Sequence, residues 1–209
     1  MKPVMEQVPC KKLYRASDKR VEPVQLAVLH WTASPPKAPE AADPERMRRW
    51  LADTNRQQST HFIILRDGSI MQAASLQERT WHAGGAFWPC PPTVGKPGGV
   101  NLRSIGIDLE NVGYLSKKPQ GSGFIDGYGG TYRGATPVKV GPQFFEPYTA
   151  PQLTSLETLA LWLLEEMPVL RDQSKCTRWV GHSKIQPGKS DPGPLFPWKR
   201  LEELIDIQP

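Results

Sequence analysis

Two histidines in this chain of 209 residues end short apolar runs, and a carboxylate follows the second. His30 ends VQLAVLH at 24–30, His182 ends CTRWVGH at 176–182, and Asp191 lies nine residues further on. Sites in open α/β sheets gather where strands end, and a catalytic zinc takes three His or carboxylate ligands plus water. Such a metal lowers the pKa of its water to about 7 and polarises a carbonyl, which suits hydrolysis. Spacing alone does not establish the site, since a single histidine is more often structural.

The elements that must position these side chains alternate between strands and helices. Asp43 and Pro44 supply an N-cap and a first-turn proline, and Asp67-Gly68 is a hairpin turn. The pattern indicates an α/β fold, a mixed central β-sheet packed by α-helices, in one domain over residues 1–209. Strands are expected at 24–30, 61–66, 69–73, 104–111 and 176–182, and helices at 44–57, from Ala150 to the stop at Pro168, and from Pro197 onward.

Segment 115–148 is rich in glycine and proline and is too long for an ordinary connection. Loops of this length are usually functional or disordered. We therefore expect a long loop insertion that covers the cleft and shapes substrate choice.

Composition favours a soluble globular protein without a nucleic-acid or membrane partner. The formal charge of +5 and pI near 9.2 come from scattered basic residues, which we interpret as solvated surface. The N-terminus lacks the apolar run of a secretory signal, and no stretch could span a bilayer. The three cysteines match no disulfide framework or metal knuckle, so we expect a reducing compartment. These features predict a monomer that is cytoplasmic as synthesised and reaches the cell wall, if at all, after lysis or by non-classical export.

Five motifs occur in a fixed order: LHWTAS, THFIILRDGSI, TWHAGG, SIGIDLEN and GHSKIQPGKSDPGPLFPW. This arrangement resembles the zinc-dependent N-acetylmuramoyl-L-alanine amidases of the type 2 family, which includes phage lysozyme-type amidases and peptidoglycan recognition proteins. The match runs from about residue 24 to 205. It implies a Zn2+ enzyme that cleaves the amide bond between N-acetylmuramic acid and L-Ala in peptidoglycan or muropeptides.

The resemblance implies that His30, His182 and Asp191 hold the zinc. Some members use cysteine at the last position, and a carboxylate there gives a more acidic metal that does not oxidise. Lys189 matches a lysine that this branch of the family places near the scissile carbonyl, where it would hold the oxyanion.

The resemblance leaves two candidates for the general base. Family members commonly carry glutamate where this chain has Asp108, which is one methylene shorter, and Glu110 lies two residues on, on the same strand face. We favour Asp108 and keep Glu110 as the alternative. Thr60 replaces the catalytic tyrosine of some phage relatives, so that route is absent.

Three further residues are expected near the substrate. His82 resembles a residue at the groove rim that hydrogen-bonds substrate, although it could instead stabilise the Gly84-Gly85 loop. Trp81 and Asn101 are expected to line sugar or peptide subsites. His61 is interpreted as structural.

Two other functions compete with a wall amidase. A peptidoglycan-binding module without catalysis would typically lack a metal ligand, whereas this chain keeps all three. A recycling amidase restricted to anhydromuropeptides would carry the same motifs. The net positive charge of this chain favours an intact, anionic wall as the substrate. The absence of a signal fits either a recycling enzyme or an endolysin.

Overall fold

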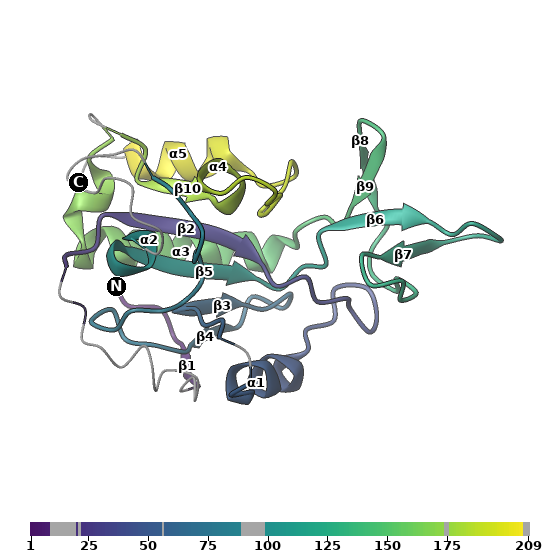
Figure 1. Ribbon diagram of the computed structural model, residues 1–209, viewed down its shortest axis with the longest axis horizontal. Coiled ribbons are helices and arrows are strands. Elements are labelled where there is room, and N and C mark those ends of the chain that lie inside the picture. The colour runs from purple at the N-terminus through teal and green to yellow at the C-terminus, as the bar shows by residue number, and fades with distance from the viewer. Residues whose placement is uncertain (9–19, 21, 56, 89–98, 174–175, 207–209) are drawn as a thin grey trace.

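A six-stranded mixed β-sheet forms the core of the protein (Figure 1). Its order is β1-β4-β3-β5-β2-β10, and the neighbouring strands run parallel except for the β3–β4 hairpin. The computed structural model describes residues 1–8, 20, 22–55, 57–88, 99–173 and 176–206. The strands are β1 (Glu6–Gln7), β2 (Leu26–Trp31), β3 (Phe62–Ile64), β4 (Ile70–Gln72), β5 (Ser104–Leu109) and β10 (Trp179–Gly181).

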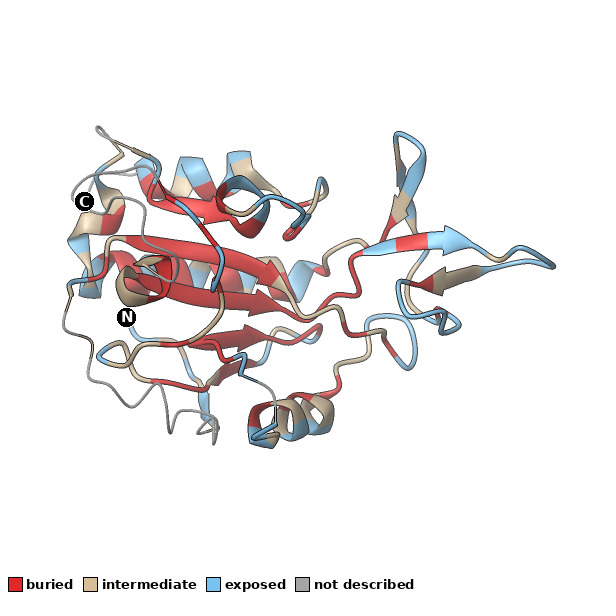
Figure 2. Cartoon of the chain, viewed as in Figure 1, coloured by how far each residue is buried: buried red, intermediate tan, exposed pale blue. Residues whose placement is uncertain are grey.

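Helices cover both faces of this sheet, as the α/β pattern predicts. Apolar side chains of α3 and α5 pack on one face, and those of α1, α2 and α4 pack on the other. The central strands are consequently buried on both sides (Figure 2). The helices are α1 (Pro44–Ala52), α2 (Gly99–Arg103), α3 (Ala150–Glu166), α4 (His182–Ile185) and α5 (Trp198–Asp206), with a 3-10 helix at Pro168–Arg171.

Strand alternation directs His30 and Asp108 to the same face. On β2, Ala27 and Leu29 pack against the α3 side, so Leu26, Val28 and His30 face the other way. On β5, Ile105 and Ile107 also pack against the α3 side. Because β2 and β5 are parallel neighbours with His30 opposite Asp108, both polar side chains emerge at one end of the sheet.

Local sequence signals set most helix boundaries. Asp43 caps α1 by accepting a hydrogen bond from the backbone of Arg46, and Thr149 and Gln152 form a capping box at α3. Helix α1 was expected to continue to residue 57, but it ends at Ala52. The following residues, Asp-Thr-Asn, have weak helix propensity and compete for backbone hydrogen bonds.

Segment 115–148 was expected as a loop, and the structure shows a small four-stranded antiparallel sheet there instead. We call residues 114–145 the extension, because they project beyond the end of the central sheet (Figure 1). Glycines at positive φ, such as Gly121 and Gly141, form its turns, and this richness in glycine hides the short strand patterns. The strands are β6 (Tyr114–Lys117), β7 (Phe124–Asp126), β8 (Val138–Val140) and β9 (Gln143–Phe145).

A buried arginine joins the extension to the central sheet. Arg66 is 1% exposed, and its guanidinium donates to both carboxylate oxygens of Glu146 at 3.0 Å. It also forms an ion pair with Glu110 at 2.9 Å and donates to the carbonyl of Ser34. These contacts connect the hairpin, the end of β5, the loop after β2 and the end of the extension.

Replacing Arg66 with methionine is expected to lower the free energy of unfolding by about 3–5 kcal/mol, because two carboxylates remain buried without their partner. Chemical denaturation checks this. Arg48→Met is the matched control, since Arg48 pairs with Glu6 and Glu45 at the surface, and it should leave the stability nearly unchanged. Equal denaturation midpoints for the two variants would contradict the role given to Arg66.

Two observations bear on the expected compartment. Cys176 is disulfide-bonded, which contradicts the expectation of reduced cysteines, because disulfides persist in oxidising surroundings. Cys10 and Cys90 lie outside the described residues. Among the described helices, none has the length and apolar character needed to cross a bilayer.

Candidate functional site

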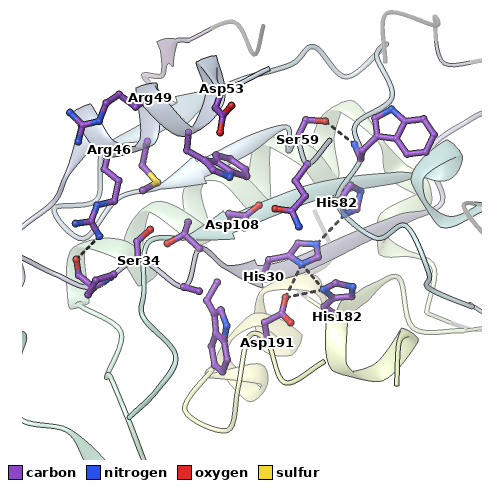
Figure 3. A pocket seen from close by; sticks show the side chains of 18 of the residues that line it. His30, Ser34, Arg46, Arg49, Asp53, Ser59, His82, Asp108, His182 and Asp191 are labelled. Carbon is purple, nitrogen blue, oxygen red and sulfur yellow. Dashed lines mark hydrogen bonds and ion pairs between the residues drawn. The ribbon is translucent and has the colours of Figure 1, made fainter. Parts of the chain in front are cut away.

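Three side chains that the sequence singled out converge at the end of the central sheet (Figure 3). Nδ1 of His30 lies 2.8 Å from Oδ2 of Asp191 and 3.1 Å from Nδ1 of His182. Nδ1 of His182 lies 3.1 Å from Oδ2 of Asp191. All three residues are buried. His30 is the residue before the last one of β2, whereas His182 comes just after β10 and begins α4.

A hydrogen-bond chain determines which ring nitrogen of His30 carries the proton. The hydroxyl of Ser104 donates to the carbonyl of Val100 at 2.6 Å, so its oxygen accepts from Nε2 of His82 at 3.0 Å. Nδ1 of His82 therefore carries a lone pair and accepts from Nε2 of His30 at 3.0 Å. The proton of His30 lies on this outer nitrogen, and Nδ1 presents a lone pair to Asp191.

Gln186 determines which ring nitrogen of His182 carries the proton. Its carbonyl oxygen lies 2.8 Å from Nε2 of His182 and accepts the ring proton, so Nδ1 of His182 is also unprotonated. Sequence reasoning missed both Gln186 and Ser104. The four-residue spacing from His182 to Gln186 on a helical turn was an available signal for the first of these.

The donor set fits a divalent cation. Two imidazole lone pairs and one carboxylate oxygen face one another within about 3 Å, with the ring protons held elsewhere. In a tetrahedral zinc site with ligand distances of about 2.0–2.2 Å, neighbouring ligand atoms lie about 3.3–3.6 Å apart, close to the separations seen here. A cation would relieve the repulsion among these three acceptors.

Asp108 stands beside the cluster on β5. It is opposite His30 in the sheet register, forms a side-chain hydrogen bond with Thr60, and lines the same cavity as the three clustered residues. Burial raises the pKa of Asp108, although His30 and the hydrogen bond from Thr60 work in the other direction. A carboxylate that lines a cavity beside such a cluster can accept a proton from a nearby water.

Glu110, the alternative base, has a structural environment instead. Its side chain is fully buried and accepts backbone N–H groups from Asp43 at 3.0 Å and Arg66 at 3.2 Å, in addition to the Arg66 ion pair. It is not among the described residues that line the cavity. The alternative therefore loses its support, because the oxygens of Glu110 are already engaged.

The residues expected near the substrate divide into two groups. Trp81 lines the cavity, as expected. His82 also borders it, and its two ring nitrogens are hydrogen-bonded to His30 and Ser104. Asn101 is fully buried, and its oxygen accepts from the backbone N–H groups of His82 and Ala83. It supports the backbone of His82 and Ala83 and is not among the described residues that line the cavity.

Lys189 lies in the exposed loop between α4 and Asp191. Its side chain is exposed and is not among the described residues lining the cavity. The backbone N–H of Lys189 donates to the carbonyl of Gln186 at 3.3 Å, which keeps the loop close to the cluster. Lys189 is thus two residues from a candidate ligand but not in place at the reacting centre.

The cavity itself is open and has a volume of 610 Å³. Its wall contains four aromatic side chains. The cluster, Asp108 and residues of α1 such as Arg46 line it as well (Figure 3). Apolar walls with a few placed polar groups are typical of small-molecule sites. The aromatic lining residues are Trp31, Trp50, Trp81 and Tyr128.

Comparisons with known proteins agree with this arrangement. The family model described as N-acetylmuramoyl-L-alanine amidase matches residues 20–194. The amidase AmiD of Escherichia coli (strain K12) is 29% identical over 188 residues, covering 86% of this chain and 52% of that protein. The 1,6-anhydro-N-acetylmuramyl-L-alanine amidase AmpD of Haemophilus influenzae is 27% identical over 197 residues. The matched region covers 88% of this chain and 84% of that protein.

Solved structures show the same fold. E. coli AmiD in complex with the substrate anhydro-N-acetylmuramic acid-L-Ala-D-gamma-Glu-L-Lys superposes with a TM-score of 0.60 at 26% identity, covering 87% of this chain and 57% of the other. A selenomethionine AmpD structure gives a TM-score of 0.61 at 24% identity, with coverage of 98% and 96%. The chain spans just over half the length of the first curated relatives, at 52% and 58%.

Proposed function

The chain belongs to the N-acetylmuramoyl-L-alanine amidase family, and from this premise we propose that it is a zinc hydrolase acting on peptidoglycan or muropeptides. It cleaves the amide bond between N-acetylmuramic acid and L-Ala, the first residue of the stem peptide. His30, His182 and Asp191 hold the zinc. The observation that carries the proposal is their convergence, with both histidine lone pairs turned inward, beside Asp108 in an open cavity.

The chemistry divides between the metal and the side chains. When bound, zinc supplies Lewis acidity that polarises the carbonyl and acidifies water. Asp108 accepts the proton of the attacking water and passes it to the nitrogen of L-Ala as the amide bond breaks. Its side chain is held toward the cavity by Thr60 and by its place on β5. Trp31 and Trp81 form walls that orient the muramoyl group and peptide.

Lys189 stabilises the negative charge that develops on the carbonyl oxygen, and its exposed loop must move toward the substrate to do so. Lys189→Ala is expected to lower kcat by about 10²–10³-fold, as loss of an oxyanion donor does. Zinc content should stay at the wild-type level, because Lys189 is not a ligand. Steady-state kinetics and metal analysis of the variant check both points, and a wild-type kcat would assign Lys189 to the solvated surface.

The reaction is tested by incubating the protein with purified sacculi and with soluble anhydromuropeptides, with and without a chelator. Mass spectrometry should show free stem peptides that begin with L-Ala and glycan that stays intact. Chelation should stop the reaction and added zinc should restore it. New reducing ends would identify a glycosidase and refute the mechanism. A protein that holds zinc but releases no peptide would instead be a binding module.

The second candidate is a recycling amidase restricted to anhydromuropeptides. It is favoured by the AmpD relatives, which are named 1,6-anhydro-N-acetylmuramyl-L-alanine amidases. The same incubation separates the two, because a recycling enzyme would cleave the soluble fragments and leave sacculi untouched. Action as a monomer remains a prediction, which sedimentation in solution would check.

A further inference from the structure

The extension is held rigidly to the catalytic domain at its base. Glu146, just after β9, is buried and accepts from Arg66 and from the backbone N–H of Val112. The backbone N–H of Glu146 in turn donates to the carbonyl of Gly113 at 3.0 Å, and the amide of Asn111 donates to the carbonyl of Glu146. Both ends of the extension are therefore tied to one buried cluster.

The extension also has a small core of its own. Leu115 and Tyr132 are buried there, and Phe124 and Phe144 pack edge to face with ring centroids 4.9 Å apart. The sheet thus has a defined shape, although most of its surface is exposed (Figure 2).

One of its turns presents a tyrosine. The buried carboxylate of Asp126 accepts from the backbone N–H groups of Tyr128 at 2.8 Å and Gly130 at 2.9 Å, and Gly129 has φ +82°. This tight turn places Tyr128 at its tip. Tyr128 is 79% exposed yet lines the same cavity as His30 and Asp108. Glycines on both sides leave the ring open to a ligand.

We propose that Tyr128 forms a sugar-binding subsite, in which its ring stacks on a saccharide of the glycan strand next to the muramoyl unit that is cut. The inference rests on the proposed function and gives the extension a role in selecting glycan-bearing substrates over isolated muramoyl peptides. Aromatic faces carry partial negative charge and attract the weakly positive C–H face of a sugar ring.

The chemistry around Tyr128 favours a sugar over the stem peptide. A stem peptide that contains glutamate carries carboxylates, which would call for a cation beside the ring. The turn that holds Tyr128 is Asp-Gly-Tyr-Gly-Gly, which contains no cation, and the carboxylate of Asp126 is engaged by the backbone of the turn. The cations that line the cavity, Arg46 and Arg49, belong to α1 instead. A neutral saccharide with one apolar face is the better match for an exposed aromatic ring in this setting.

Tyr128→Ala tests the proposal on two substrates with the same stem peptide, one built on a GlcNAc-MurNAc tetrasaccharide and one on N-acetylmuramic acid alone. We expect kcat/KM for the tetrasaccharide substrate to fall about three- to tenfold, the size of one aromatic contact, and kcat/KM for the short substrate to stay unchanged. An equal loss on both substrates, or no loss on either, would overturn the subsite.

Two control variants and a binding measurement complete the test. Tyr128→Phe keeps the ring and should keep the preference for the tetrasaccharide substrate. Val138→Ala changes an exposed residue of the same sheet that is not among the described cavity-lining residues, and it should also keep the preference.

Binding of a peptide-free tetrasaccharide, followed by NMR, needs no catalysis. Binding that depends on Tyr128 without any hydrolysis by the wild type would refute the proposed function and leave the subsite standing. Binding that ignores Tyr128 would refute the subsite alone.

Discussion

Replacing His182 with alanine is expected to abolish zinc binding and turnover together. The variant removes one of three ligand atoms and leaves His30 and Asp191 to hold the cation with two. Zinc contributes several kcal/mol of transition-state stabilisation, so kcat should fall by more than about 10³-fold. Metal content after dialysis and release of stem peptides measure the two effects separately.

The control for His182 lies on the same helix. Lys184 is exposed on α4, and Lys184→Ala should keep both zinc and activity. Gln186→Ala gives an intermediate case, because it removes the partner of the outer ring nitrogen of His182, and metal affinity should drop by about 10–100-fold. A folded His182→Ala protein that binds one zinc with wild-type affinity would remove this residue from the ligand set.

The variant Asp108→Asn is expected to lower kcat by about 10²–10⁴-fold, the usual contribution of a positioned proton acceptor. An amide cannot accept the proton of the attacking water, yet it has nearly the same shape and can keep the hydrogen bond to Thr60. Zinc content should therefore remain at the wild-type level. Single-turnover kinetics on a soluble muropeptide measure the loss in the chemical step.

Asp108→Glu and Glu110→Gln complete this test. Asp108→Glu restores the longer carboxylate that the family commonly carries, and it should retain much more activity than the asparagine variant. Glu110→Gln weakens the buried contacts with Arg66, so it should lower the free energy of unfolding while the folded protein keeps its kcat. The reverse pattern, with kcat lost in Glu110→Gln and kept in Asp108→Asn, would make Glu110 the base.

Much of the fold was readable from local patterns. The apolar runs ending at His30 and just before His182 form neighbouring parallel strands, and the Asp67-Gly68 turn joins an antiparallel hairpin. Helix α3 begins at Ala150 and ends just before Pro168, as expected from the sequence. These features depend on propensities and periodicities within about ten residues, which is the range over which the sequence carries direct information.

The extension was not readable in the same way. Its strands are three or four residues long, too short for a clear alternation, and glycines interrupt them. The small sheet forms because Phe124 meets Phe144 and because Arg66 reaches Glu146 from 80 residues away. Contacts of this kind exist only after the chain has folded back on itself.

The candidate site shows the same division between sequence and tertiary structure. The order of the motifs was sufficient to nominate His30, His182 and Asp191, because each lies within one of the motifs that occur in that order. Strand alternation placed Asp108 and Glu110 on one face but could not separate their roles. Only the tertiary structure brought Arg66 to Glu110 and left Asp108 in the cavity, and only it turned His82 toward His30. The reason is physical: the partner of a buried polar atom is whichever group the fold brings within about 3 Å, and sequence distance does not limit that choice.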